Sequence, residues 1–229
     1  MTGHSFRSAI SMEGLPEYRV IRAESDFPVP GEPSFWRAIP ALKVSHYLWL
    51  DNGYRPYVEV RLCHSQQNLY VHYDVFEAKI RVRYTRFQDP VYKDSCVEFF
   101  VDPFPEKKVG YINLETNALG TLLVAIGPGR NRRTPIPQAH LEGFEIVTSV
   151  KRPVSGYHGA EFWTLAYKLP LSLFEKYYGS QTMAGRAARA NFYKCGDETE
   201  TPHFGAWSPV QSPQPDFHRP EFFGRLVFE

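Results

Sequence analysis

Alternation of apolar and polar residues is the feature of this sequence that most limits its fold. In YVEVRL, residues 57–62, the valines and the leucine lie on one side of an extended chain, whereas the glutamate and the arginine point to the other. NLYVHYDVF, residues 68–76, continues the same two-residue period. This period is typical of half-buried β-strands, and the short connection between the two segments predicts a hairpin.

Similar segments recur along the chain and predict an all-β fold. Strands are expected at 57–62, 68–76, 79–84, 95–102, 110–116, 121–127, 144–150, 161–169, 189–195 and 223–229. Roughly ten short strands at this spacing favour an antiparallel β-sandwich of the jelly-roll type. Only PLSLFEKYYG, residues 170–179, looks helical, because Pro170 and Ser172 are start signals and Gly179 is a stop signal.

Length and composition agree with this interpretation. The 229 residues, 43% of them hydrophobic, suit one well-filled domain. Aromatic residues make up 15% of the chain and there are 19 prolines, which favours strands joined by stiff loops. We expect residues 1–32, which contain the run FPVPGEP, to be a loose lead-in and residues 33–229 to form the domain.

Charge and hydropathy exclude several classes of partner. The net charge of +1 offers no basic surface for nucleic acid, and no apolar run is long enough to span a membrane. The N-terminal residues show no secretory signal, so the chain as written is expected in the cytoplasm. Cys63, Cys96 and Cys195 cannot all pair and form no CxxC motif, so we interpret them as buried thiols.

Two predicted strands carry polar side chains on one face. In DSCVEFFVDP, Glu98 shares a face with Cys96 and Phe100, where a carboxylate needs hydrogen-bond donors from the protein or from a ligand. In GYINLETNALG, Asn113 and Glu115 share a face with Tyr111 and Asn117. Amides and carboxylates in register suit a ligand rich in hydroxyl groups, although an exposed polar sheet face remains the alternative.

Two loops leave their interpretation open. Trp207, between Gly205 and Pro209, is either tucked under its loop or offered as a stacking surface for the apolar face of a sugar. Cys195, His203 and His218 match no standard zinc spacing. The basic cluster in GPGRNRRTPIPQAH, residues 127–140, is expected to be solvated.

The chain resembles the carbohydrate-binding module family 9-like domains over about residues 33–229. The resemblance rests on DSCVEFFVDP, GYINLETNALGT, EFWTLAYKLP, PDFHRPEFFGRLVFE and, above all, RANFYKCGDETETPHFGAWSPV. It implies a β-sandwich that holds a sugar, at the reducing end of a glycan, between two aromatic rings. By position, Glu98 matches a glutamate that hydrogen-bonds the sugar, while Tyr92 and Trp207 match the two rings.

The chain also departs from that pattern. Tyr92 stands where the family has a tryptophan, Val97 where it has a lysine, and Phe204 where it has an asparagine. Structural calcium occurs in the family, and three aspartates could supply oxygen ligands, although no loop has a calcium-binding spacing: Asp74, Asp94 and Asp102. The family is usually extracellular, whereas the N-terminal residues of this chain show no secretory signal.

Three functions follow as hypotheses. The first is a non-catalytic module for a mono- or oligosaccharide that works beside a glycoside hydrolase acting on the same glycan. Its expected ligand-binding residues are Tyr92, Glu98, Asn113, Glu115, Asn191 and Trp207, with no confidently expected cofactor. The second is a glycoside hydrolase that uses Glu98 and Glu115 as its carboxylate pair. The third is a haem protein with His72 or His203 as the axial ligand.

Overall fold

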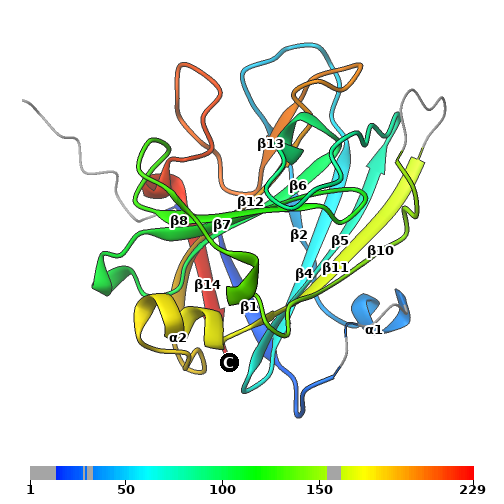
Figure 1. Ribbon diagram of the computed structural model, residues 1–229. Helices are drawn as coiled ribbons and strands as arrows, with labels where there is room; N and C mark the ends of the chain where they lie inside the picture. Colours follow the sequence, from blue (N-terminus) through cyan, green and yellow to red (C-terminus); the bar gives the residue numbers. More distant parts are fainter. Residues whose placement is uncertain (1–13, 28, 30–32, 154–160) are drawn as a thin grey trace, which may run out of the picture.

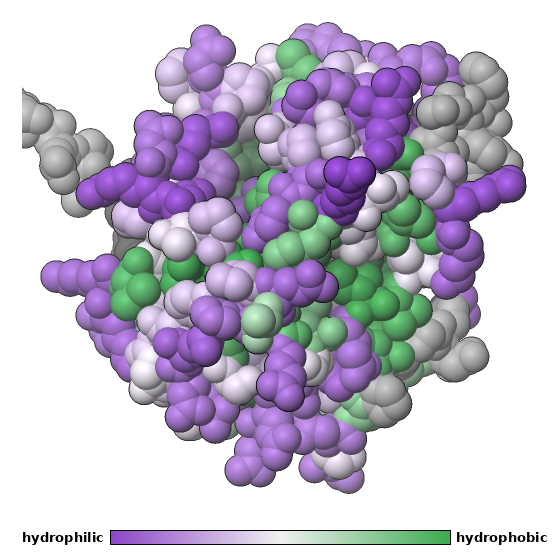
Figure 2. Space-filling model, in the orientation of Figure 1, coloured by the Kyte–Doolittle hydropathy of each residue, from purple (hydrophilic) through white to green (hydrophobic). Residues whose placement is uncertain are grey.

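Most of the alternating segments form strands of one large, curled, mixed β-sheet (Figure 1). The computed structural model describes residues 14–27, 29, 33–153 and 161–229. Within these residues the all-β prediction is confirmed, and no helix is long and apolar enough to cross a membrane. On the face shown in Figure 2, hydrophilic residues predominate around the edge and hydrophobic residues gather toward the middle.

The sheet has two halves. The β5 half runs in the order β10 (Glu145–Thr148), β11 (Glu161–Pro170), β5 (Asn68–Glu77) and β4 (Tyr57–His64), with β2 (Leu42–Val44) on β4. The β6 half runs in the order β14 (Gly224–Phe228), β12 (Ala187–Cys195), β6 (Cys96–Asp102), β7 (Tyr111–Asn117), β8 (Leu122–Gly127) and β9 (Thr134–Pro135). β13 (Phe204–Ala206) pairs with β12, and β3 (His46–Tyr47) pairs with β13.

β1 (Glu17–Arg22) joins the two halves. It pairs in parallel with β14 on one side and with β4 on the other, whereas the other pairings among the described residues are antiparallel. The fold therefore departs from a purely antiparallel sandwich. Residues 17–22 also lie inside the segment expected as a lead-in, so the folded unit includes strand residues N-terminal to residue 33.

The main core lies between the two halves. Val58, Val60 and Leu62 of β4 are buried there, as their alternation predicts, together with Val97 and Phe99 of β6. The opposite face of β6 is also buried, because segments after β13 cover it. A second apolar cluster forms there, and its members include Phe100, Tyr111, Tyr193, Phe217 and Phe223. Two covered faces explain why β6 and β7 are buried along nearly their whole length.

Two predicted elements differ from the structure. Residues 79–84 form no strand apart from an isolated bridge at Val82. The backbone amides of Arg83 and Tyr84 instead donate to the Asp94 carboxylate, each at 2.9 Å, which removes them from strand pairing. The predicted helix is present as α2 (Ser172–Tyr178), and the structure adds helices at α1 (Pro33–Arg37), η1 (Val91–Lys93), η2 (Pro105–Lys107), η3 (Gln138–His140) and η4 (Pro220–Phe222).

Candidate functional site

A cavity of about 390 Å³ lies over the face of β6 and β7 that points away from the main core. Side chains of β6, β7, β8, β12, β13 and η1 contribute to its wall, and residues of the loops after β8, β12 and β13 complete it. The lining residues are Tyr92, Glu98, Asn113, Glu115, Leu123, Ala125, Arg130, Arg133, Cys195, Asp197, Phe204, Pro215, Asp216, Phe217 and His218. Four of the six predicted ligand-binding residues are among them: Tyr92, Glu98, Asn113 and Glu115.

Glu98 and Glu115 form a buried carboxyl pair in this wall. They are direct cross-strand partners on β6 and β7, and their exposed fractions are 3% and 5%. Burial raises the pKa of Glu115 to about 7. Burial and the nearby charge of Glu115 together raise the pKa of Glu98 well above its usual range. Glu98 therefore keeps a proton at pH values where an exposed glutamate is ionised.

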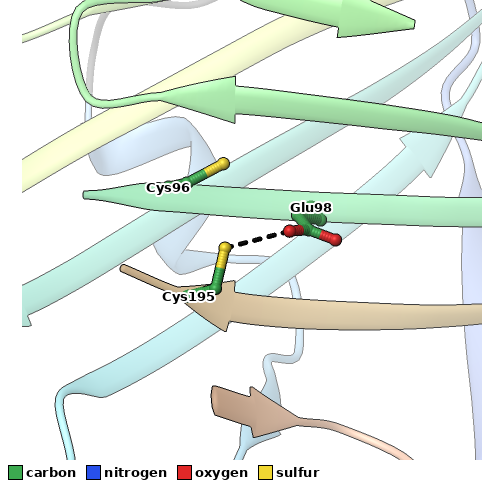
Figure 3. A group of neighbouring side chains, drawn as sticks. All are labelled: Cys96, Glu98 and Cys195. Atoms are coloured by element: carbon green, nitrogen blue, oxygen red, sulfur yellow. Dashed lines mark hydrogen bonds between the residues drawn. The ribbon is translucent and has the colours of Figure 1, made fainter. Parts of the chain in front are cut away.

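Each carboxyl group of the pair has one hydrogen-bond donor among the described side chains. The Cys195 thiol donates to Oε1 of Glu98 at 2.9 Å (Figure 3), and Nδ2 of Asn113 donates to Oε1 of Glu115 at 2.8 Å. A carboxyl group can form more than one hydrogen bond. The pair thus keeps hydrogen-bonding capacity for a molecule in the cavity.

Arg133 fixes the orientation of Asn113. Its Nη2 donates to Oδ1 of Asn113, to the carbonyl of Ala125 at 2.9 Å and to the carbonyl of Tyr111 at 3.2 Å. The guanidinium also lies 4.4 Å from the centre of the Tyr111 ring, a cation–π distance. With Oδ1 directed at Arg133, the amide nitrogen is directed at Glu115.

The expectation of a solvated basic cluster is wrong for Arg133, which is partly buried in the cavity wall. The expectation of a solvated side chain holds for Arg130, which is 54% exposed and whose Nε lies 2.9 Å from Oδ1 of Asp216. Sequence reasoning missed Arg133 because three arginines in an irregular loop look alike, and only the fold shows which one turns inward.

Aromatic side chains supply the apolar part of the cavity. Tyr92 and Phe204 are partly exposed in its wall. Phe217 is more deeply buried and stacks on Tyr193, with ring centres 4.0 Å apart. Phe204 meets Phe217 edge-on, with ring centres 6.1 Å apart. The cavity thus combines aromatic surface with a polar carboxyl and amide group, as sites for sugars commonly do.

Trp207 does not line this cavity. It is 7% exposed and packs in the main core against Phe192, with ring centres 5.9 Å apart. The indole also fills the space beside Gly224, where a Cβ would lie 2.6 Å from Trp207 Cζ3. Phe204 and Trp207 are separated by three positions, so in extended chain their side chains fall on opposite faces. The structure therefore places Trp207 under its loop and Phe204 at the cavity.

Asn191 and Val97 also lie outside the cavity. Asn191 is fully buried, and its amide exchanges two hydrogen bonds of 2.9 Å with the backbone of Ser208. It thereby holds the segment after β13 against β12. Val97 points into the main core, on the opposite face of β6 from Glu98.

Cys195, His203 and His218, which were considered as zinc ligands, each interact with a different side chain. Cys195 donates to Glu98, whereas His203 Nε2 lies 2.8 Å from Nζ of the buried Lys194. His218 Nδ1 lies 2.8 Å from the Tyr111 hydroxyl, and burial lowers the pKa of His218 to about 3, so its ring is neutral. The structure does not bring these three residues to one point.

The candidates for calcium and haem are likewise engaged elsewhere. Asp94 accepts from Arg81 at 2.6 Å, Asp74 pairs with His72 at 3.1 Å, and Asp102 accepts from the Phe104 amide at 3.3 Å. His72 stacks on Trp36, with ring centres 4.8 Å apart. Within the described part of the chain, the three aspartates do not form one cluster of potential metal ligands.

Comparison with known proteins agrees with the β-rich fold. Over residues 36–228 the sequence matches carbohydrate-binding family 9. The chain therefore belongs to this family. A search of curated proteins found no match.

Solved structures show the same similarity. A protein from Bacteroides uniformis, described as a candidate carbohydrate-binding protein, is 33% identical with a TM-score of 0.84, over 93% of this chain and 99% of that one. A family 9 module from Caldicellulosiruptor kristjanssonii in complex with glucose is 11% identical with a TM-score of 0.62, over 93% and 96% of the two chains. The cellotriose complex of such a module is 12% identical with a TM-score of 0.60, over 93% and 94%.

Proposed function

We propose that this chain binds a sugar unit in the cavity beside Glu98 and Glu115 and does not transform it. The observation that carries the proposal is the carboxyl pair, which is buried and keeps hydrogen-bonding capacity directed at a cavity with aromatic walls. The cavity volume of about 390 Å³ lies within the range of small-molecule sites. Related modules in complex with glucose and cellotriose support the class of ligand.

The chemistry of the wall suits sugar hydroxyl groups. A protonated Glu98 both donates and accepts a hydrogen bond, whereas an ionised Glu115 only accepts. Asn113 stays fixed by Arg133 and contributes a further polar edge. A sugar ring is apolar on its faces, and we assign Tyr92 and Phe204 as the side chains that contact these faces. Phe204 takes the place that the family resemblance implies for Trp207.

Isothermal titration with glucose and cellotriose tests the proposal. Replacing Tyr92 or Phe204 by alanine is expected to weaken binding about tenfold, since loss of one aromatic contact costs about 1–2 kcal/mol. The matched control is Phe162→Ala on β11, since Phe162 is 50% exposed and lies outside the cavity. Equal affinity for all variants, or no heat with either sugar, would contradict the proposal.

The same pair of carboxyl groups makes an activity assay necessary. Glycoside hydrolases use two carboxyl groups, one of them with a raised pKa, and this structure places such a pair side by side. Incubation with aryl glycosides is expected to release no aglycone. Release that disappears in Glu98→Gln would replace the binding proposal by the hydrolase alternative. A binding module of this kind works beside a separate glycoside hydrolase on the same glycan.

A further inference from the structure

Cys96, Glu98 and Cys195 form a cluster beside the cavity (Figure 3). Their potential ligand atoms, two thiol sulfurs and a carboxylate oxygen, all lie within 4.8 Å of one another, and all three residues are buried. Cys96 and Cys195 are direct cross-strand partners on β6 and β12, so the backbone sets the separation of the two thiols. Glu98 lies two positions from Cys96 on the same face of β6.

We propose that these three side chains bind a thiophilic divalent cation of the Zn²⁺ type. Two cysteine sulfurs and a carboxylate oxygen are a donor set that Zn²⁺ prefers, while Ca²⁺ and Mg²⁺ take oxygen ligands. Ligand atoms on a tetrahedral zinc lie about 3.3–3.8 Å apart, since the bonds measure about 2.0–2.3 Å. The present ligand atoms lie within 4.8 Å of one another, which is at most about 1.5 Å beyond that spacing.

The fourth position of the metal faces the cavity. Glu98 and Cys195 line the cavity, whereas Cys96 is not among its lining residues. Three protein ligands with a fourth position open to a cavity leave room for water or for an oxygen of a bound molecule. The site therefore differs from a closed structural zinc site, in which the protein supplies all four ligands.

Binding converts the cluster from a protonated to a metallated state. Zn²⁺ replaces the two thiol protons, which are released to solvent, and the carboxyl proton of Glu98 is released as well when that group carries one. Affinity is therefore expected to rise with pH. The metal has to displace these protons against burial, which raises the pKa of Cys96 to about 12 and, together with the charge of Glu115, raises the pKa of Glu98 well above its usual range. The charges of Lys194 near Cys96 and of Arg130 near Glu98 oppose these shifts and favour the ionised ligands.

Co²⁺ is a suitable probe, because it takes zinc sites and thiolate ligands give it a charge-transfer band. The chelator-treated, reduced protein is titrated with Co²⁺ without oxygen. We expect one equivalent to bind with a thiolate-to-cobalt band that added Zn²⁺ abolishes. Cys96→Ser and Cys195→Ser should each weaken Co²⁺ binding more than tenfold and reduce the band. Cys63→Ser is the matched control, because Cys63 is also buried but lies in a separate apolar cluster.

Glu98→Gln provides a second test of the proposal if a cysteine variant fails to fold. It retains both sulfurs, so the charge-transfer band should persist while the affinity for Co²⁺ falls. Absence of the band in the unmodified chain, or an equal band in Cys195→Ser with circular dichroism showing a folded protein, would overturn the proposal. The metal titration needs no sugar, so a chain that binds Co²⁺ but neither glucose nor cellotriose would contradict the sugar proposal alone.

Discussion

Replacement of Glu115 by glutamine should change how stability depends on pH. Burial raises the pKa of Glu115 from an ordinary value of 4.5 to about 7. Between these values the folded protein holds a proton that the unfolded chain has lost, so the free energy of unfolding falls as pH rises through this window and stays low above it. A shift of this size corresponds to up to about 3 kcal/mol, since one pKa unit is about 1.4 kcal/mol.

Glutamine removes this titration and keeps the oxygen that accepts from Asn113. We therefore expect Glu115→Gln to match the unmodified chain near pH 4.5 and to be more stable by up to about 3 kcal/mol at pH 8. Urea unfolding at both pH values measures the difference, with the exposed Glu24→Gln as the control. Parallel pH profiles for the Glu115 variant and the unmodified chain would refute the assignment of a buried, proton-holding carboxyl.

Further predictions concern the core around the site. Lys194→Met should lower the free energy of unfolding by about 3–5 kcal/mol, because Lys194 is fully buried in an ion pair with Glu77. Lys79→Met, which breaks an exposed ion pair, is the control and should change the free energy of unfolding by less than about 1 kcal/mol. Thermal unfolding measures both. Gly224→Ala should cost about 1–3 kcal/mol, because its Cβ would meet Trp207, while Gly129→Ala, with open space around it, should cost little in the same assay. Trp207→Phe should lower the unfolding temperature without changing sugar affinity in calorimetry; weakened binding by a folded variant would place Trp207 in the site.

The strands that the sequence predicts best are those with one clear apolar face. β4 alternates between buried and less buried positions over residues 57–62, and β5 does so over residues 74–77, although both faces of β5 are buried before that. β1 is hard to predict, because EYRVIR is short and follows a polar segment, and its parallel partners lie far away along the chain. Residues 79–84 carry the right period but form no strand, because a buried aspartate takes two of their amides. Periodicity cannot reveal such competition from a distant side chain.

Some residues of the site could likewise be predicted from the sequence, and others could not. Glu98, Asn113 and Glu115 could be predicted to share a surface, because each lies at a fixed position of a strand. Arg133 and Phe217 reach the cavity from irregular loops, whose paths no period specifies. The family resemblance points to Trp207, which lies in the correct segment. Which face of the sheet a side chain of this segment occupies depends on where β13 ends, and Phe204 rather than Trp207 lies at the cavity.

β1 has one consequence for how the domain is made. Its neighbours, β4 and β14, are encoded at opposite parts of the sequence. During translation β1 can meet β4 early, but its bonds to β14 have to wait until residues 224–228 leave the ribosome. Until then the nascent chain carries an unsatisfied strand edge, which is open to pairing with other chains. The two halves of the sheet are therefore joined only after β14 has been made.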